Sequence, residues 1–234
     1  MSAPSPDAPR RASPRPVRLP SQDGTVAISR LGESAIARVA TYDAGVGNVV
    51  KCARWRDAHL LACTGSSGGV ALLDTRLGRA ASTPLGDASH AHRNRLGAYC
   101  VRWAPHDESL LLSVSAREMR LHDLRVTARP LHVLRGHAEA REGDDACKRI
   151  FTPTFSHGGR AVTCLGAKSQ RLTVYSVADG AIVSQGDLGG RVAASSGGSV
   201  LSIGPRQPAG QPEVPEVLML ASGKTFESYV ARRA

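Results

Sequence analysis

Aromatic residues are scarce in this 234-residue chain: they occupy 4% of the positions, although 41% of the residues are hydrophobic. Because bulky side chains are so few, we expect the tryptophans and phenylalanines to anchor the packing. Their scarcity also argues against extensive stacking on nucleic-acid bases. Long hydrophobic runs are absent as well: no run approaches the roughly 18 apolar residues that a membrane helix needs. We therefore expect no membrane segment.

Paired cysteines are also lacking, because the five cysteines include no C-x-x-C pair and their number is odd. Several of them lie in apolar runs, where a free thiol behaves as a small hydrophobic side chain. The pattern argues against a disulfide framework and against a zinc site. It indicates a reducing compartment, the cytoplasm or the nucleus, and no cofactor.

Motifs of catalysis and nucleotide binding are missing too. "SSGGS" at 195–199 is flanked by strand-like residues and is no nucleophile elbow, and "ASGKTF" at 221–226 lacks the first glycine of a Walker loop. His90 and His92, in "SHAHRN", offer two metal ligands at most, and a loop pair of this kind more often faces solvent. We expect neither an enzyme nor a small-molecule substrate.

Negative charge is in the minority: 20 acidic residues stand against 30 basic ones, for a net charge of +10. A basic surface favours nucleic acid, anionic lipid or acidic proteins and says little about the fold. Most of the basic residues are arginines spread along the chain. A compositional bias therefore explains the charge as well as a binding site does.

The first 20 residues form a distinct segment, rich in Pro, Ser and Arg and with a single acid, Asp7. Such a segment cannot bury enough apolar area to offset the entropy of ordering it. Its prolines oppose the amphipathic helix of an organelle transit peptide. We predict a disordered tail over 1–20.

What the sequence does contain is an internal repeat. Three segments, 49–78, 97–126 and 151–180, share one outline: an aromatic near the start, a short polar turn, an apolar strand, a second small turn and a second strand. The three aromatics are Trp55, Trp103 and Phe155. Their spacings exceed the ~40–45 residues of a propeller blade, and the excess lies in polar connecting loops.

The period inside each repeat is two residues. In "VALLDTR", Val70 and Leu72 point to one face while Ala71 and Leu73 point to the other. Nothing from 49 to 230 holds a helical stripe for three turns. Short strands with regular turns predict an all-β array.

Both ends of the array read as partial copies. The segments 21–31 and 35–42 read as a third and a fourth strand. At the other end, 199–204, 216–223 and 225–231 read as a first, a second and a third strand. We interpret the two ends as halves that complete one shared blade, which would close a ring.

These repeats resemble WD repeats, the four-stranded blades of a β-propeller, over residues 21–231. In that family a His, a Ser or Thr, a turn Asp and a Trp form a buried hydrogen-bond network. Here Gly136-His137 matches the Gly-His that opens a repeat, and the Trp-Asp position falls at Leu73-Asp74, His122-Asp123 and Tyr175-Ser176. No repeat keeps the whole set, but apolar packing between blades can hold such an array without it.

The resemblance implies an all-β fold, a β-propeller of four-stranded antiparallel blades over 21–234, with four or five blades visible. Seven blades of ~40–45 residues would need about 300 residues, so the sequence predicts a small or an incomplete ring. Trp55, Trp103, Phe155 and His137 are its expected structural residues.

Two repeats end in Asp-x-Arg, as Asp74-Thr75-Arg76 and Asp123-Leu124-Arg125. These endings resemble the W-D-x-R box of propellers that dock on the adaptor of a cullin-RING ubiquitin ligase as substrate receptors. "LACTGSSGGVALLDTR" has the sixteen-residue length of that box, although neither box keeps the Trp. The resemblance implies that Asp74, Arg76, Asp123 and Arg125 bind protein.

Two other interpretations stay open. In the first, each Asp and Arg form a surface ion pair that only orders the turn, and the chain is an unspecified non-enzymatic scaffold for other proteins. In the second, basic loop residues share a rim and bind the phosphates of RNA or DNA with strong salt dependence. Those residues are Arg93, Arg95, Arg117, Arg120, Lys148 and Arg149.

Overall fold

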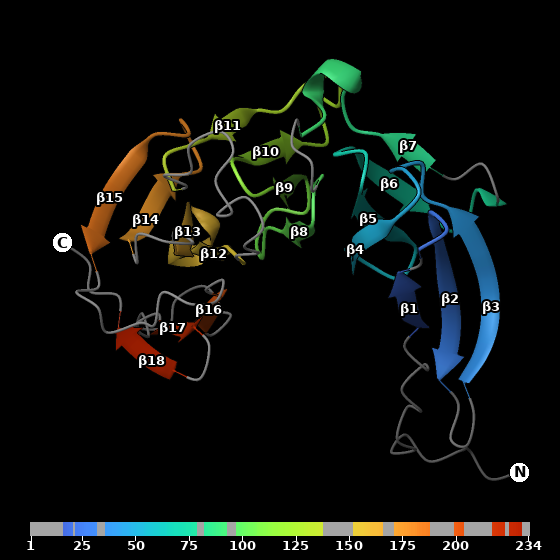
Figure 1. Cartoon of the computed structure of the whole chain (residues 1–234), viewed down its shortest axis with the longest axis horizontal. Coiled ribbons are helices and arrows are strands. Elements are labelled where there is room, and N and C mark those ends of the chain that lie inside the picture. Colours follow the sequence, from blue (N-terminus) through green and yellow to red (C-terminus); the bar gives the residue numbers. More distant parts are fainter. Residues whose placement is uncertain are drawn as a thin grey trace, which may run out of the picture.

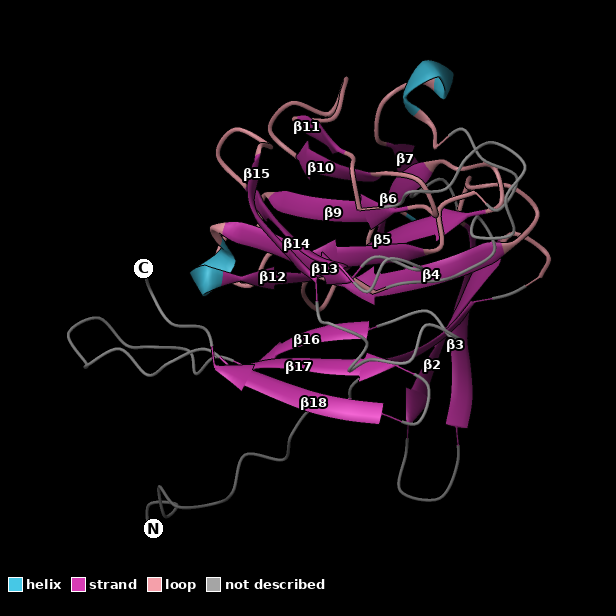
Figure 2. Ribbon diagram, turned by 60° about the vertical axis from the view of Figure 1, so that its left-hand side comes forward, coloured by secondary structure: helices cyan, strands magenta, loops and turns pink. Residues whose placement is uncertain are grey.

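The computed structural model describes residues 16–20, 22–31, 36–78, 82–92, 97–137, 152–165, 171–187, 199–203, 217–222 and 225–230. The regular structure in these ranges is β-strand, apart from short 3-10 turns such as η2 (Ala88–His90) and η4 (His157–Gly159), which lie at the edges of the array (Figure 2). Within the described part of the chain, no helix is long and apolar enough to cross a membrane. The prediction of an all-β chain is confirmed.

The strands form five antiparallel sheets that follow one another in chain order around an arc (Figure 1). The first sheet contains β1 (Pro16–Pro20), β2 (Thr25–Leu31) and β3 (Ile36–Asp43). The second contains β4 (Val50–Trp55), β5 (Leu60–Gly65), β6 (Val70–Asp74) and β7 (Ser82–Pro84). The third contains β8 (Cys100–Trp103), β9 (Leu110–Val114), β10 (Met119–Asp123) and β11 (His132–Leu134). The fourth contains β12 (Thr154–Ser156), β13 (Ala161–Leu165), β14 (Arg171–Ser176) and β15 (Ile182–Asp187). The fifth contains β16 (Ser199–Ile203), β17 (Val217–Ser222) and β18 (Thr225–Val230).

Each sheet is an up-and-down meander in which neighbours along the chain are neighbours in space. The first strand of a sheet lies on the inside of the arc and the last on the outside (Figure 1). The chain then crosses to the innermost strand of the next sheet, so that β4 lies against β8 and β12 against β16. This order is that of propeller blades, and the predicted fold class is confirmed.

The hydrophobic core lies in layers between neighbouring sheets, so a central sheet buries both of its faces. The layer between the first and second sheets includes Val26, Val46, Leu61 and Leu73. The layer between the second and third includes Val70, Val101 and Leu111, and the layer between the third and fourth includes Leu112, Met119, Phe155 and Tyr175. Strands β9 and β13 are buried at every position, which explains why they read as continuous apolar runs.

The three repeat aromatics stand at equivalent positions. Trp55 pairs with Leu61, Trp103 with Leu111 and Phe155 with Val162, each at the start of the following strand. The indole N–H of Trp103 also donates a 2.9 Å hydrogen bond to the carbonyl oxygen of Arg54, which ties β8 to β4 of the neighbouring sheet. Each aromatic therefore packs at the boundary between an inner strand and its neighbour.

The predicted boundary of the tail at residue 20 is wrong for its last five residues. Pro16–Pro20 form β1, which pairs with β2 from Pro16 opposite Arg30 to Pro20 opposite Val26. Proline is tolerated here because β1 is an edge strand, where an amide N–H is not required on the open side. Residues 1–15 lie outside the described residues.

The segments predicted as strands at both ends are strands, but β2 and β3 are the second and third strands of their sheet and not the predicted third and fourth, and no shared blade forms among the described residues. The segments 21–31 and 35–42 contain β2 and β3, and the three C-terminal segments contain β16, β17 and β18. In the described residues these strands pair only within two separate three-stranded sheets. The N-terminal sheet gains a first strand, β1, that was not predicted.

Candidate interaction surface

In each of the two Asp-x-Arg turns, the Arg side chain binds the Asp side chain of the same turn. At the end of β6, Arg76 Nε donates to Asp74 Oδ1 (2.9 Å) and Arg76 Nη2 to Asp74 Oδ2 (2.6 Å), while the Arg76 backbone N–H also binds Oδ1 (3.0 Å). At the end of β10, Arg125 repeats these contacts with Asp123 at 2.9, 2.8 and 2.9 Å. Each pair is a side-on, bidentate ion pair.

The guanidinium groups of both pairs face solvent, whereas the carboxylates do not. The Arg76 and Arg125 side chains are 65% and 70% exposed, against 17% and 13% for Asp74 and Asp123. The hydrogen bond from Arg76 lowers the pKa of Asp74 to about 2, and Arg125 likewise lowers the pKa of Asp123. Both pairs thus stay ionised at neutral pH and present a fixed cation to the outside.

A second, neighbouring turn supports each pair. Asp57 Oδ1 accepts the N–H groups of His59 (2.7 Å) and Leu60 (2.9 Å), and the His59 carbonyl then accepts the N–H of Thr75 (2.9 Å). In the next sheet, the Ser109 carbonyl accepts the N–H of Leu124 (2.8 Å) in the same way. The two arginines therefore occupy equivalent places on one rim of adjacent blades.

Exposed apolar side chains flank this rim. Leu77, just past the first turn, is 65% exposed, and Val126 and Leu131 near the second are 55% and 47% exposed. A shallow hollow of about 290 Å³ is lined by Asp123, Val126, Arg129, Pro130 and Leu131. Arginine beside exposed apolar surface is a composition typical of protein-binding surfaces.

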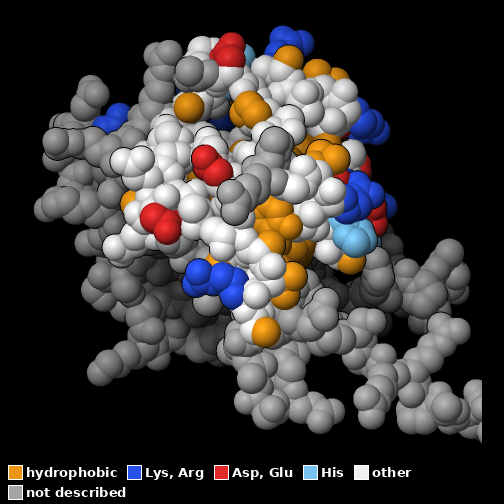
Figure 3. Space-filling view, turned by 90° about the vertical axis from the view of Figure 1, so that its right-hand side faces the viewer, with side chains coloured by type: hydrophobic (Ala, Val, Ile, Leu, Met, Phe, Trp, Pro, Cys, Tyr) orange, Lys and Arg blue, Asp and Glu red, His pale blue; other side chains and the backbone are white. Residues whose placement is uncertain are grey.

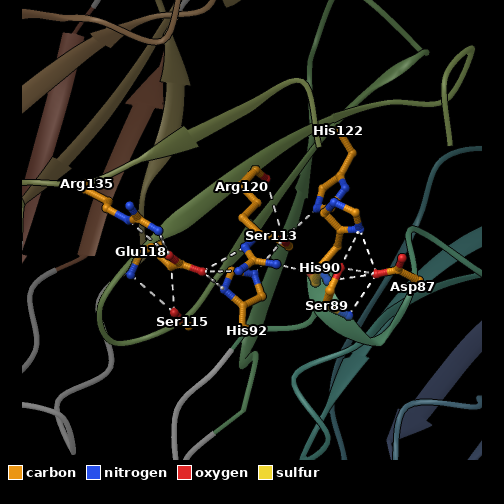
Figure 4. Close-up of polar contacts among 10 residues, drawn as sticks. All are labelled: Asp87, Ser89, His90, His92, Ser113, Ser115, Glu118, Arg120, His122 and Arg135. Atoms are coloured by element: carbon orange, nitrogen blue, oxygen red, sulfur yellow. Dashed lines mark hydrogen bonds and ion pairs between the residues drawn. The ribbon is translucent and has the colours of Figure 1, made fainter. Parts of the chain in front are cut away.

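A buried polar network joins side chains of β9 and β10 to His92 (Figure 4). His92 Nε2 and His122 Nε2 each lie 2.8 Å from Ser113 Oγ, and all three side chains are buried. A hydroxyl donates one hydrogen bond and accepts others, and Ser113 Oγ also lies 3.5 Å from the Arg120 carbonyl oxygen, so this one hydroxyl links both imidazoles to the β10 backbone. Glu118 Oε1 lies 3.7 Å from His92 Nδ1. The set resembles the buried network of WD repeats, with His122 at the Trp position and Glu118 in the acidic role.

The prediction that His90 and His92 both face solvent is wrong for His92. It is 2% exposed, and its backbone N–H donates to the Gly68 carbonyl (2.9 Å). Only His90 stays near the surface, where Asp87 Oδ1 binds its Nδ1 at 2.8 Å. The sequence analysis missed His92 because Ala91, and not Gly, precedes it, so the Gly-His pair that opens a WD repeat is incomplete here.

The same three positions carry different chemistry in the neighbouring sheets. Strand register places Cys63 and Cys164 at the position of Ser113, and Leu73 and Tyr175 at that of His122. In the second sheet, Val46 completes an apolar set with Cys63 and Leu73, all of them fully buried. The same three positions thus hold apolar side chains in the second sheet and hydrogen-bonded polar side chains in the third.

In the fourth sheet the set is mixed. The predicted structural residue His137 is 2% exposed, and its Nδ1 lies 3.2 Å from the Tyr175 hydroxyl, with the two rings in an edge-on arrangement. The Tyr175 hydroxyl also donates to the Arg135 carbonyl oxygen (2.8 Å). Burial lowers the pKa of His137 to about 4, and it lowers the pKa values of His92 and His122 to about 3. All three imidazoles are therefore neutral at pH 7.

The prediction that Arg120 lies on a basic rim is wrong. This side chain is buried on β10, binds Glu118 Oε1 through Nη2 at 2.5 Å and donates to the His90 carbonyl. Of the other five basic residues proposed for that rim, Arg117 is half-buried, and Arg93, Arg95, Lys148 and Arg149 lie outside the described residues. On the face seen in Figure 3, basic side chains are scattered among acidic and uncharged ones and form no continuous stripe.

Comparison with known proteins agrees with this architecture. The sequence matches no protein-family model and no curated protein. Among solved structures, it is similar to the β-propeller domain of Cps50 (Swd1) from Myceliophteria thermophila, with a TM-score of 0.61 and 14% sequence identity. The match covers 93% of this chain and 62% of that domain, so the chain spans less than two thirds of its neighbour's length. The chain thus has a β-propeller fold, of which five blades lie within the described residues.

Proposed function

We propose that this propeller is a non-enzymatic scaffold that binds other proteins through the rim of Asp74, Arg76, Asp123 and Arg125, and that its partner there is the adaptor of a cullin-RING ubiquitin ligase. The observation that carries the proposal is the duplication of one geometry. Two side-on Asp–Arg pairs stand at equivalent positions of adjacent blades, and the Arg side chains are 65% and 70% exposed. A partner that recognises one pair meets a second pair on the next blade.

The physical argument rests on preorganisation. A surface ion pair contributes at most ~1 kcal/mol to folding, so stabilising the turn is a small effect. Its larger consequence is that each guanidinium is held in one orientation, because Nε and Nη2 are both bound to the carboxylate. The remaining Nη1 edge is then aimed at solvent, and binding it costs a partner little side-chain entropy. Exposed Leu77 and Val126 add apolar area beside it.

The proposal predicts the behaviour of Arg76→Ala combined with Arg125→Ala. Removing both guanidiniums should abolish co-purification with the ligase adaptor, measured by affinity pull-down and mass spectrometry. The thermal melting curve should change little, because the removed groups are exposed and their ion pairs contribute little.

A matched control is Arg160→Ala, which removes an exposed arginine in the turn before β13 and leaves both Asp-x-Arg turns and the Asp57 turn intact. It should retain the adaptor. Unchanged recovery of the adaptor with the double variant would contradict the proposal, and equal loss with the control would assign binding to general charge.

A further inference from the structure

The hollow beside the second Asp-x-Arg turn is formed by the end of β10 and by the loop that joins β10 to β11, residues 124–131. Two backbone hydrogen bonds fix this loop to its surroundings. The Leu131 N–H donates to the Leu121 carbonyl on β10 (2.7 Å), and the Gly86 N–H, just after β7 of the second sheet, donates to the Thr127 carbonyl (2.8 Å). The hollow is therefore formed before any partner binds, and filling it costs little loop entropy.

Three residues that line the hollow are apolar and accessible. Val126 and Leu131 are 55% and 47% exposed, and Pro130 is half-buried. The volume of about 290 Å³ lies below the roughly 300–1,000 Å³ that is usual for small-molecule pockets, so the hollow suits one or two side chains of another protein. Its apolar lining favours an aliphatic side chain, because contact with it removes apolar area of both partners from water.

The charged residues that line the hollow leave it with excess positive charge. Both carboxylate oxygens of Asp123 are already bound, because Arg125 Nε donates to Oδ1 (2.9 Å) and Arg125 Nη2 to Oδ2 (2.8 Å). The Arg129 side chain is exposed, and within the described part of the chain its guanidinium forms no ion pair and no hydrogen bond. A carboxylate is therefore the group that complements the charge of this hollow.

We propose that the hollow binds a partner segment in which an aliphatic side chain stands next to an aspartate or a glutamate. The aliphatic side chain lies against Val126, Pro130 and Leu131, and the carboxylate pairs with Arg129. The inference rests on the proposed function, because the hollow adjoins the Asp123–Arg125 pair and the ligase adaptor is the protein that supplies the segment. It adds the chemistry that the adaptor presents at this place.

Two substitutions test whether the adaptor occupies the hollow. Leu131→Asp places a carboxylate among the apolar residues, and Arg129→Glu reverses the unpaired charge. Each should weaken the affinity for the purified adaptor by about tenfold or more, measured by isothermal titration calorimetry on the full chain, since an attractive contact is replaced by repulsion between carboxylates. The melting temperature should change little, because both side chains are exposed.

Matched controls make the same changes at exposed positions of the fourth sheet. Val183→Asp, on β15, replaces an apolar side chain that is 67% exposed, and Arg160→Glu reverses an exposed arginine just before β13. Both control variants should bind the adaptor with the affinity of the wild-type protein. Equal weakening by the controls would overturn the inference, because net charge and not the hollow would then determine binding.

A charge-swap selection tests the chemistry of the hollow without the adaptor. A displayed library of random peptides is selected on the wild-type chain and, in parallel, on Arg129→Glu. Peptides enriched on the wild type should carry an aliphatic residue beside Asp or Glu, and Leu131→Asp should not retain them. On Arg129→Glu the aliphatic residue should persist while Lys or Arg replaces the acid, a reversal that a merely structural role of Arg129 does not produce. The inference is wrong if nothing is enriched, or if both proteins select the same charge.

The inference and the proposed function can fail separately. If Arg76→Ala with Arg125→Ala loses the adaptor while Leu131→Asp and Arg129→Glu retain it, the rim binds the adaptor and the inference about the hollow is wrong. If the double variant retains the adaptor, the proposed function is wrong, and the charge-swap selection alone decides the chemistry of the hollow.

Discussion

Lowering the pH from 7 to 5 should decrease the free energy of unfolding by about 2 kcal/mol for each of His92 and His122, within a factor of two. Both groups have a pKa of about 3 in the folded chain, against 6.5 when free, because burial disfavours the imidazolium. The unfolded chain therefore binds protons below pH 6.5 while the folded chain does not. Stability is at its full value above pH 6.5 and falls as the pH drops towards 3. Urea denaturation at a series of pH values measures the loss.

The second blade supplies the matched control for this prediction. Its Val46, Cys63 and Leu73 fill the same three positions without an ionisable imidazole. The triple variant His92→Val, Ser113→Cys, His122→Leu transfers that apolar set to the third blade. Its free energy of unfolding should fall by about 4 kcal/mol less than that of the wild type between pH 7 and pH 5, since His137 titrates in both proteins. An equal fall in both would show that other groups cause the acid sensitivity.

The charges near His92 strengthen the expectation. Glu118 is the acid that could stabilise an imidazolium there, but it already binds Arg120 at 2.5 Å and Arg135 at 3.1 Å. One carboxylate between two guanidiniums leaves a net positive charge close to His92. Arg120 consequently adds to the effect of burial in lowering the pKa of His92.

Replacing Gly68 with Ala should destabilise the fold by about 2–5 kcal/mol. Gly68 has a φ of +80°, and a Cβ added there would overlap the carbonyl oxygen of His92. The segment that carries His92 would have to move away. The hydrogen bond from the His92 backbone N–H to the Gly68 carbonyl would then be lost, together with the hydrogen bond between the His92 imidazole and Ser113. Chemical denaturation at pH 7 measures the change.

Gly78→Ala separates the two causes. Gly78 has a similar φ of +70°, but an added Cβ there meets no heavy atom of the described residues within 4 Å. This variant should cost only the backbone penalty of about 1–2 kcal/mol. Similar losses in the two variants would mean that the approach of Gly68 to His92 contributes nothing.

Several features of this protein could be predicted from its residues alone. Alternating strands such as 70–76, the three repeat aromatics and the Asp-x-Arg endings each depend on positions close together in the chain. Local spacing fixes which side chains share a face of a strand and which turn follows it. The all-β fold, the blade pattern and the internal geometry of the Asp74–Arg76 pair are of this kind, because the two partners are two residues apart.

Tertiary structure decided the features that depend on contacts between distant segments. His92 joins Ser113 because Gly68, in another turn, lets the backbone approach, and Trp103 of one blade binds the Arg54 carbonyl oxygen of the next because the two blades pack together. The strand at Pro16–Pro20 likewise exists because β2 offers an edge to pair with, and within the described residues the two ends of the array form two separate three-stranded sheets. A sequence pattern reports the preferences of neighbouring residues, whereas the burial of a histidine or the pairing of an edge depends on what the rest of the chain brings next to it.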